Sequence, residues 1–311
     1  MSTLLVTGAA GFIGSHTCDQ LLAAGHTVLG VDNLRTGRRA NLAGAQRSAA
    51  FRFVEADITA DATLDRLAAE AKPDAIIHLA ALVSVQESIG NPELNFRLNV
   101  QATHLVAETA RRHAVRRVVF ASSAAVYGDA PQLPLTEQAA AHPISPYGAA
   151  KLASEAILSG HAAAFGFTAR CLRYFNVYGP RQDPNSPYSG VISIFCDQLR
   201  TGVAPRIFGD GEQTRDFISV DDVARANLLA ATAPDHASGV ANICTGRATS
   251  LNRLSGVLRT LIPQAPAAVH GAAKAADIRH SFGASDAARA ELGFTAKVAL
   301  EDGLAALLAP R

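Results

Sequence analysis

Tyr147 and Lys151 are the two residues whose types and spacing best suit the removal of a proton from an alcohol. They are four residues apart, so on a helix they would lie on one face, one turn from each other. A free tyrosine has a pKa near ~10 and is a poor base at neutral pH. A lysine ammonium beside it favours the phenolate and lowers that pKa. An exposed Tyr and Lys on an ordinary helix surface have the same spacing, so the rest of the chain must decide between the two interpretations.

The residues around this pair predict how it is positioned. Ser145 can accept hydrogen bonds from free backbone amides and Pro146 suits the first helical position, so a helix should begin there. Ser123 stands at the exit of a predicted strand at 117–121. It is a third candidate for the same chemistry.

A glycine-rich turn near the start of the chain indicates a dinucleotide site. Gly8, Gly11 and Gly14 follow a short apolar run at 3–7 and precede a helix expected at about 15–24. Strand, glycine turn and helix in this order are the context that a dinucleotide fingerprint requires. The glycines let the backbone approach a pyrophosphate closely, and the helix N-terminus faces the phosphates with its partial positive charge.

Asp32 follows a second predicted strand at 26–31, eighteen residues beyond Gly14. A carboxylate there can accept hydrogen bonds from both hydroxyls of the adenosine ribose and would repel a 2′-phosphate. This favours NAD over NADP, although Arg35 is near enough to leave NADP open. Arg35, Arg38 and Arg39 form a local basic cluster that we interpret as a solvated loop.

Further strands are predicted at 51–58, 75–79, 117–121 and 168–174, with a long amphipathic helix at 92–113. Asp57 lies at the end of the first of these, and His78 lies in an apolar run that is typical of a core histidine. Strands that alternate with helices predict an α/β fold with a doubly wound, parallel Rossmann sheet.

The pattern changes after Phe175, where a polar loop at 179–187 precedes a helix at 191–200 and a short strand at 205–208. The chain is expected to return towards the first domain at 215–218. A helix capped by Asp221 and a strand at 240–243 should follow. We predict a Rossmann domain for NAD at 1–175 plus 216–245. A smaller mixed α/β domain for the substrate is predicted at 176–215 plus 246–311.

Composition narrows the class of protein. The 311 residues are 49% hydrophobic and 18% charged with a net charge of +1, so a substantial core is expected and a nucleic-acid partner is not. Short, punctuated apolar stretches predict no membrane span, and a strand directly at the N-terminus leaves no room for a signal peptide. Four scattered cysteines without metal-ligand spacing predict buried thiols, no metal site and a cytoplasmic protein; these are Cys18, Cys171, Cys196 and Cys244.

With these features in place, the chain resembles the extended short-chain dehydrogenase/reductase family, and within it the UDP-hexose 4-epimerases, over nearly its whole length. The matching motifs, in order, are GAAGFIGS, Asp32-Asn33-Leu34, Asp57-Ile58, HLAAL, SSAAVYG, YGAAK, LRYFNVYGPRQ, RDFISVDD and ADIRHS.

The resemblance implies a tightly held NAD and a sugar nucleotide bound between two domains. Its implied catalytic residues are Ser123, Tyr147 and Lys151. The implied cofactor-binding residues are Gly8, Gly11, Phe12, Ile13, Gly14, Asp32, Asn33, Leu34, Asp57, Ile58, Leu79, Ala80, Ala81, Asn99, Tyr147, Lys151 and Phe175. The implied substrate-binding residues are Ser84, Ser123, Tyr147, Asn176, Val191, Arg215, Lys274 and Ser281. Lys274 stands where the family commonly has an arginine, so the charge is kept and the bidentate fork is lost.

The resemblance also implies the reaction, which is C4 epimerisation of a UDP-hexose through a transient 4-keto sugar. Tyr147 would take the proton of the 4-hydroxyl, C4 would give its hydride to NAD, and the hydride would return on the other face. Serine at 281 and at 84 leaves room for an acetamido group, so both the plain and the N-acetylated pairs are expected as substrates. The helices that begin at Pro92 and Pro146 match those that form a four-helix homodimer interface in relatives.

Two other functions compete with this one. A 4,6-dehydratase or a decarboxylase of the same family would carry carboxylates after Ser123, whereas this chain has Ala124 and Ala125. That argues against both enzymes and leaves a 4-keto reductase as the alternative enzyme. A non-catalytic dinucleotide sensor would keep the glycine turn but has no reason to keep Ser123, Tyr147 and Lys151 together.

Overall fold

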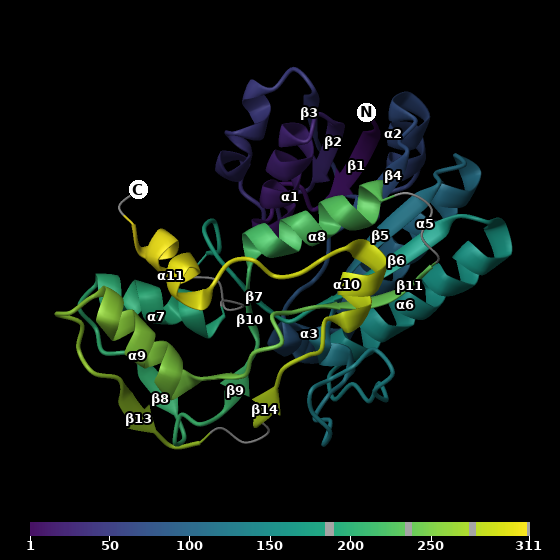
Figure 1. Cartoon of the computed structure of the whole chain (residues 1–311). Coiled ribbons are helices and arrows are strands. Elements are labelled where there is room, and N and C mark those ends of the chain that lie inside the picture. The colour runs from purple at the N-terminus through teal and green to yellow at the C-terminus, as the bar shows by residue number, and fades with distance from the viewer. Residues whose placement is uncertain (184–189, 234–237, 274–277, 310–311) are drawn as a thin grey trace.

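In the computed structural model, which describes residues 1–183, 190–233, 238–273 and 278–309, a seven-stranded parallel sheet forms the larger part of the molecule (Figure 1). The strand order is β11-β6-β5-β4-β1-β2-β3. The strands are β1 (Thr3–Thr7), β2 (Thr27–Asp32), β3 (Phe51–Glu55), β4 (Ala75–His78), β5 (Arg117–Ser123), β6 (Thr168–Tyr174) and β11 (Gly239–Ile243). The predicted parallel Rossmann sheet is confirmed.

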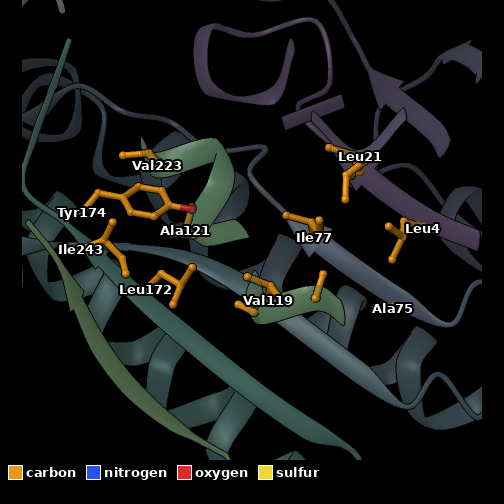
Figure 2. Packing of buried hydrophobic residues seen from close by; sticks show 14 of the residues in the cluster. Leu4, Leu21, Ala75, Ile77, Val119, Ala121, Leu172, Tyr174, Val223 and Ile243 are labelled. Atoms are coloured by element: carbon orange, nitrogen blue, oxygen red, sulfur yellow. The ribbon is translucent and has the colours of Figure 1, made fainter. Parts of the chain in front are cut away.

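Helices cover both faces of this sheet. One face is covered by α1 (Phe12–Ala23), α8 (Val220–Thr232) and α10 (Asp286–Leu292), and the other by α2 (Thr63–Ala71), α5 (Ala102–Arg112) and α6 (Pro146–Phe165). Successive strand residues point to opposite faces, so Leu4 and Leu5 enter different cores. Figure 2 shows the first of these cores, where strand residues pack with helix residues; it includes Leu4, Ile77, Val119, Leu172, Leu21 and Val223.

Strand β1 pairs with β2 on one side and with β4 on the other. The connections therefore change direction at β1, and the loops after the flanking strands leave the sheet towards opposite faces. In open α/β sheets this switch point opens a crevice at the carboxyl ends of the strands, where ligands bind.

Short elements after Tyr174 build a further core, separate from the two beside the sheet. The short strands are β7 (Asn176–Tyr178), β8 (Arg206–Phe208), β9 (Thr214–Arg215), β10 (Phe217–Ser219), β12 (Thr249–Ser250), β13 (Val269–Gly271) and β14 (His280–Ser281). They pair as β10-β7, β12-β9-β14 and β13-β8. The helices α7 (Val191–Arg200), α9 (Leu251–Leu261) and α11 (Leu300–Leu308) pack their apolar faces together in this core. A smaller mixed α/β part is thus present beside the sheet (Figure 1).

The remaining helical segments are short. They are α3 (Val85–Gly90), α4 (Pro92–Asn95), the π-helical η3 (Phe96–Gln101) and the 3₁₀ turns η1 (Arg39–Leu42), η2 (Ala45–Arg47) and η4 (Ala124–Val126). The helix predicted at 92–113 is therefore α4, η3 and α5 in succession, with a π-helical segment that the apolar periodicity did not indicate.

Two predicted helix starts were wrong. Helix α1 begins at Phe12, not at Ser15, because Gly11 is already its N-cap. Helix α8 is capped by Ser219, whose Oγ accepts a hydrogen bond from the Asp221 amide at 3.2 Å. Asp221 lies in the first turn instead, where its negative charge is favourable at the positive end of the helix dipole.

The predicted core residues lie where expected. His78 is buried, and its Nδ1 is 2.8 Å from Thr7 Oγ1. Burial lowers the pKa of His78 to about 3, so this ring is neutral. The four cysteines are all free and buried. Among the helices described by the structure, none has both the length and the apolar character needed to cross a bilayer.

Candidate active site

A cavity of about 1080 Å³ lies at the carboxyl ends of the sheet strands. Its walls come from the glycine turn, the ends of β2 and β5, the start of α6, and residues of β7, α7, β9 and β14. The predicted site residues that line it are Gly8, Gly11, Phe12, Ile13, Gly14, Asp32, Asn33, Leu34, Asp57, Ile58, Leu79, Ala80, Ala81, Ser123, Tyr147, Lys151, Phe175, Asn176, Val191, Arg215 and Ser281. Segments more than 250 residues apart in the sequence thus share one cavity.

Two of the predicted residues that the structure describes do not line this cavity. Asn99 is buried behind its wall, where its amide oxygen accepts from the Leu82 amide at 3.1 Å and its amide nitrogen donates to the Leu82 carbonyl at 3.0 Å. It supports the loop after β4 from behind. Ser84 is also buried, and its Oγ caps α3 by accepting from the Glu87 amide at 2.9 Å. Lys274 lies outside the described residues.

Close backbone contacts explain the glycines of the turn. Gly8 has a φ of +71°, and a Cβ on it would lie 2.7 Å from the Ala80 amide nitrogen. A Cβ on Gly14 would lie 2.0 Å from the Gly8 carbonyl oxygen. Only glycine fits these positions, and the N-terminus of α1 is left open to the cavity, which suits a pyrophosphate.

Asp32 lies at the end of β2 with 8% of its surface exposed. Its carboxylate accepts hydrogen bonds from the Leu34 amide at 2.8 Å and the Ala10 amide at 3.0 Å. Burial raises the pKa of the Asp32 carboxyl above its ordinary value, and the backbone hydrogen bonds oppose this shift. The residue at position 37 of the nearby loop must lack a side chain, because a Cβ on Gly37 would lie 2.9 Å from both carboxylate oxygens of Asp32. A fixed acceptor at this position suits a ribose diol.

Ser123, Tyr147 and Lys151 come together at the other end of the same cavity. Ser123 ends β5, and Tyr147 and Lys151 lie one turn apart at the start of α6. The predicted start of this helix is confirmed, since Ser145 Oγ accepts from the Gly148 amide at 3.1 Å and Pro146 is its first residue. Ser123 is close enough to the Tyr147 side chain to lower the pKa of its hydroxyl.

Lys151 is almost completely buried, with 3% of its surface exposed. Its Nζ donates to the Ala121 carbonyl at 2.8 Å and lies 4.8 Å from the centroid of the Phe120 ring and 5.8 Å from that of Tyr147. Burial lowers the pKa of Lys151 to about 7, and the charge of Glu155 opposes that shift. The arrangement can hold an ammonium, a phenol and a hydroxyl around one reacting oxygen.

Comparison with known proteins identifies the family. A model described as the NAD dependent epimerase/dehydratase family matches residues 4–244. The chain belongs to this family. A curated relative, the UDP-glucose 4-epimerase of Mycolicibacterium smegmatis, is 42% identical over 302 residues, which cover 97% of this chain and 96% of the relative.

Solved structures of similar proteins agree along the whole chain. The UDP-glucose 4-epimerase of Thermotoga maritima with UDP-glucose has a TM-score of 0.92 and 37% identity, and the match covers 98% of this chain and 97% of that one. The UDP-N-acetylglucosamine 4-epimerase of Methanobrevibacter ruminantium in complex with UDP-N-acetylmuramic acid has a TM-score of 0.93 and 34% identity, with coverage of 99% and 97%.

In this member of the NAD-dependent epimerase/dehydratase family, the predicted effect of Lys151 on the pKa of Tyr147 was wrong. The spacing predicted that Lys151 lowers the pKa of Tyr147. In the protein alone, burial raises the pKa of Tyr147 above its ordinary value, and Ser123 only opposes that shift. Lys151 directs its ammonium to Ala121 instead, so burial outweighs it. A positive charge bound in the cavity would favour the phenolate.

The basic cluster after Asp32 lies on an exposed loop, as predicted, since Arg35, Arg38 and Arg39 are all exposed. Arg35 and Arg38 also line the cavity, which the sequence analysis did not predict. Arg35 forms an ion pair with Glu87 of α3, and Arg38 forms one with Asp183, which follows β7. The position of both arginines in the loop after β2, at the carboxyl edge of the sheet, was the signal that could have indicated this role.

Proposed function

We propose that this protein interconverts the C4 epimers of a UDP-hexose, with NAD as a cofactor that it retains between turnovers. The expected substrates are UDP-glucose and UDP-galactose and the corresponding N-acetylated pair. The observation that carries this proposal is that one cavity joins Ser123, Tyr147 and Lys151 to the glycine turn and Asp32. The family match and the 42% identical UDP-glucose 4-epimerase support it.

The residues at one end of the cavity fit NAD. Gly8, Gly11 and Gly14 leave the backbone room that a pyrophosphate needs, and the carboxylate of Asp32 would hold the adenosine ribose. Asp57 and Ile58 would flank the adenine. When bound, NAD supplies a hydride acceptor that later returns the hydride to C4.

The residues at the other end would move the proton. Tyr147 would take the proton of the sugar 4-hydroxyl as a phenolate, and Ser123 would donate a hydrogen bond to the reacting oxygen as charge develops there. Lys151 would stabilise the phenolate electrostatically. Because the resulting 4-keto sugar is planar at C4, returning the hydride to its opposite face inverts that centre.

We propose that the nucleotide diphosphate is held away from the reacting ring, by Asn176, Val191 and Arg215 of the short strands and α7, with Lys274 assisting. The first three line the cavity. Anchoring the substrate by its diphosphate leaves the keto sugar free to turn over within the cavity. In this proposal, residues 1–175 plus 216–245 form the NAD domain, and 176–215 plus 246–311 form the sugar-nucleotide domain.

A 4-keto reductase on the same scaffold remains the second candidate. It would use the same Ser, Tyr and Lys, but would release its oxidised cofactor after each turnover. Ala124 and Ala125 line the cavity where a dehydratase would need carboxylates, which favours chemistry confined to C4. The two enzymes therefore differ in one measurable quantity, because a reductase consumes reduced cofactor and an epimerase does not.

We propose in addition a cytoplasmic homodimer formed by a four-helix bundle. Helices α5 and α6 pack side by side on the protein surface. Phe96 at the start of η3 is 59% exposed and Phe165 at the end of α6 is 53% exposed. The two side chains lie at opposite ends of this helix pair, so a second copy that packs along the length of the pair would cover both.

The experiment begins with the protein as purified. The bound nucleotide is released by denaturation and identified by mass, and the native protein is then incubated with UDP-glucose and with UDP-N-acetylglucosamine without added cofactor. We expect NAD, and conversion of each substrate to a mixture with its C4 epimer. Bound NADP would contradict the role given to Asp32. Turnover that occurs only when reduced cofactor is added, and that consumes it stoichiometrically, would identify a reductase instead.

A further inference from the structure

Glu155 is a buried carboxylate that has no place in the mechanism above. It lies on α6 one turn beyond Lys151, behind the wall of the cavity. Arg173 of β6 holds it with a fork, in which Nε donates to Oε1 at 2.9 Å and Nη2 donates to Oε2 at 2.7 Å. The two side chains are only 7% and 6% exposed.

A buried ion pair of this kind needs an explanation other than stability. Removing two charges from water costs about as much as their attraction returns, and well-packed apolar residues are often as stable. The position of Glu155 suggests the explanation, because it repeats the spacing of Tyr147 and Lys151 on the same helix face. The three residues form a row along α6 that leads from the cavity into the core.

The neighbouring strand is tied to the same carboxylate. Ser122 donates its hydroxyl hydrogen bond to Glu155 Oε1, and Ser122 directly precedes Ser123. Arg173 is fixed in turn, since its guanidinium carbon lies 4.7 Å from the centroid of the Tyr127 ring, and Tyr127 donates to Asn242 Oδ1 at 2.6 Å. Glu155 therefore joins the two elements that carry the reacting side chains, β5 and α6.

The surroundings of Lys151 show why a negative charge matters there. Its hydrogen-bond acceptor, the Ala121 carbonyl, is neutral. His78 of β4, Cys171 of β6 and Tyr147 of α6 are neutral as well, because burial lowers the pKa of His78 and raises the pKa of Cys171 and of Tyr147. Arg173 is positive, but it faces Glu155. Burial lowers the pKa of Lys151, and Glu155 is the charge that raises it.

We propose that Glu155 is a positioning residue, which keeps Lys151 in its ammonium form and fixes the end of β5 beside it. This role rests on the proposed function for its consequence in turnover, but the charge state of Lys151 can be measured without turnover. Under the proposed function, Tyr147 acts as a base while Lys151 is charged, so the carboxylate of Glu155 sets the upper pH limit of activity.

The sign of the expected pH effect follows from the charges. A lysine loses its ammonium as the pH rises through its pKa. Glu155→Gln removes the charge that raises this pKa, so Lys151 should lose its proton at a lower pH, by roughly one unit or more. Ser122→Ala is the matched control, because it removes one hydrogen bond to Glu155 but leaves the carboxylate charge.

The direct measurement is a titration of Lys151 by NMR in the holoenzyme, with lysine labelled with carbon-13 at the ε position. The sequence contains four lysines, at 72, 151, 274 and 297, so the spectrum is simple and Lys151→Met assigns the signal. We expect the midpoint to fall in Glu155→Gln and to stay in place in Ser122→Ala. The alkaline limb of the kcat/KM profile should shift with it.

A second variant covers the case in which Glu155→Gln leaves Arg173 unpaired and the protein does not fold. Glu155→Gln combined with Arg173→Met removes both charges, and the Lys151 midpoint should still fall. An unchanged midpoint in either folded variant overturns the proposal and leaves Glu155 as a structural residue. If the native enzyme has no epimerase activity while the midpoint falls as expected, the proposed function fails and the role of Glu155 towards Lys151 stands.

Discussion

The two ends of the cavity hold their buried charges in different ways. At the end proposed to bind the dinucleotide, Asp32 accepts hydrogen bonds from the backbone amides of Ala10 and Leu34. At the proposed catalytic end, Lys151 donates to one backbone carbonyl, burial lowers its pKa, and the charge of Glu155 opposes that shift. Backbone amides do not titrate, whereas side chains do. The first end is thus a fixed recognition surface, and the second is an arrangement whose reactivity follows pH and neighbouring charges.

The strongest test of this comparison is Tyr147→Phe, which should affect the catalytic end alone. The variant keeps the ring and removes the oxygen that accepts the proton. Loss of a general base typically lowers the rate ~10²–10⁴-fold. NAD should stay bound, because the glycine turn and Asp32 are unchanged. Measurement of kcat on UDP-glucose, together with the nucleotide content of the purified variant, checks both expectations.

Tyr127→Phe is the matched control for that variant. Its hydroxyl is buried and bonded to Asn242, outside the cavity lining, so its loss should lower stability by about 1 kcal/mol and leave kcat within a few-fold. Near-native turnover in Tyr147→Phe would show that Tyr147 is not the base. Loss of NAD from it would show that the two ends are not independent.

Gly14→Ala should act on the opposite end. The new Cβ would lie 2.0 Å from the Gly8 carbonyl oxygen, so the turn must shift. Overpacking of this kind typically costs roughly 1–3 kcal/mol. We expect part of this free-energy cost to weaken cofactor binding, so that NAD affinity falls roughly tenfold. Activity should then fall in proportion to NAD occupancy and recover with added NAD. Equilibrium binding of NAD to the stripped protein measures the change.

Gly256→Ala is the comparison for this second prediction. Gly256 lies on α9, and a Cβ added to it would have nothing within 4 Å, so alanine should be tolerated there and NAD affinity should be native. Activity of Gly14→Ala that does not recover with saturating NAD would contradict a purely dinucleotide role for the turn.

Ser281→Tyr should have the smallest and most selective effect of these substitutions. Ser281 ends β14, pairs with Arg215 of β9 and lines the cavity. If it leaves room for the acetamido group, the added ring should lower kcat/KM for UDP-N-acetylglucosamine by roughly tenfold or more and largely spare UDP-glucose. His280→Ala, on the neighbouring residue outside the cavity lining, should leave the ratio of the two values unchanged. Equal losses on both substrates would defeat this assignment.

The sequence by itself determined the features that depend on neighbouring residues in the chain. The strand and helix periodicities gave the parallel sheet, Ser145 and Pro146 gave the start of α6, and the spacing of Tyr147 and Lys151 gave a shared helix face. The glycine turn and Asp32 could be predicted from the sequence for the same reason. Each is a local property of backbone geometry, hydrogen bonding or side-chain direction, which does not depend on how the rest of the chain packs.

Only the tertiary structure decided the features that depend on burial and on partners distant in the sequence. Asn99 and Ser84 bond to nearby backbone instead of lining the cavity, and the Arg35–Glu87 pair joins loops that no local pattern connects. The pKa of Tyr147 rises although Lys151 is one turn away, because burial penalises the phenolate more than a lysine turned towards Ala121 can stabilise it. Burial and direction of a charged group are properties of the packed chain, and a spacing of four residues determines neither.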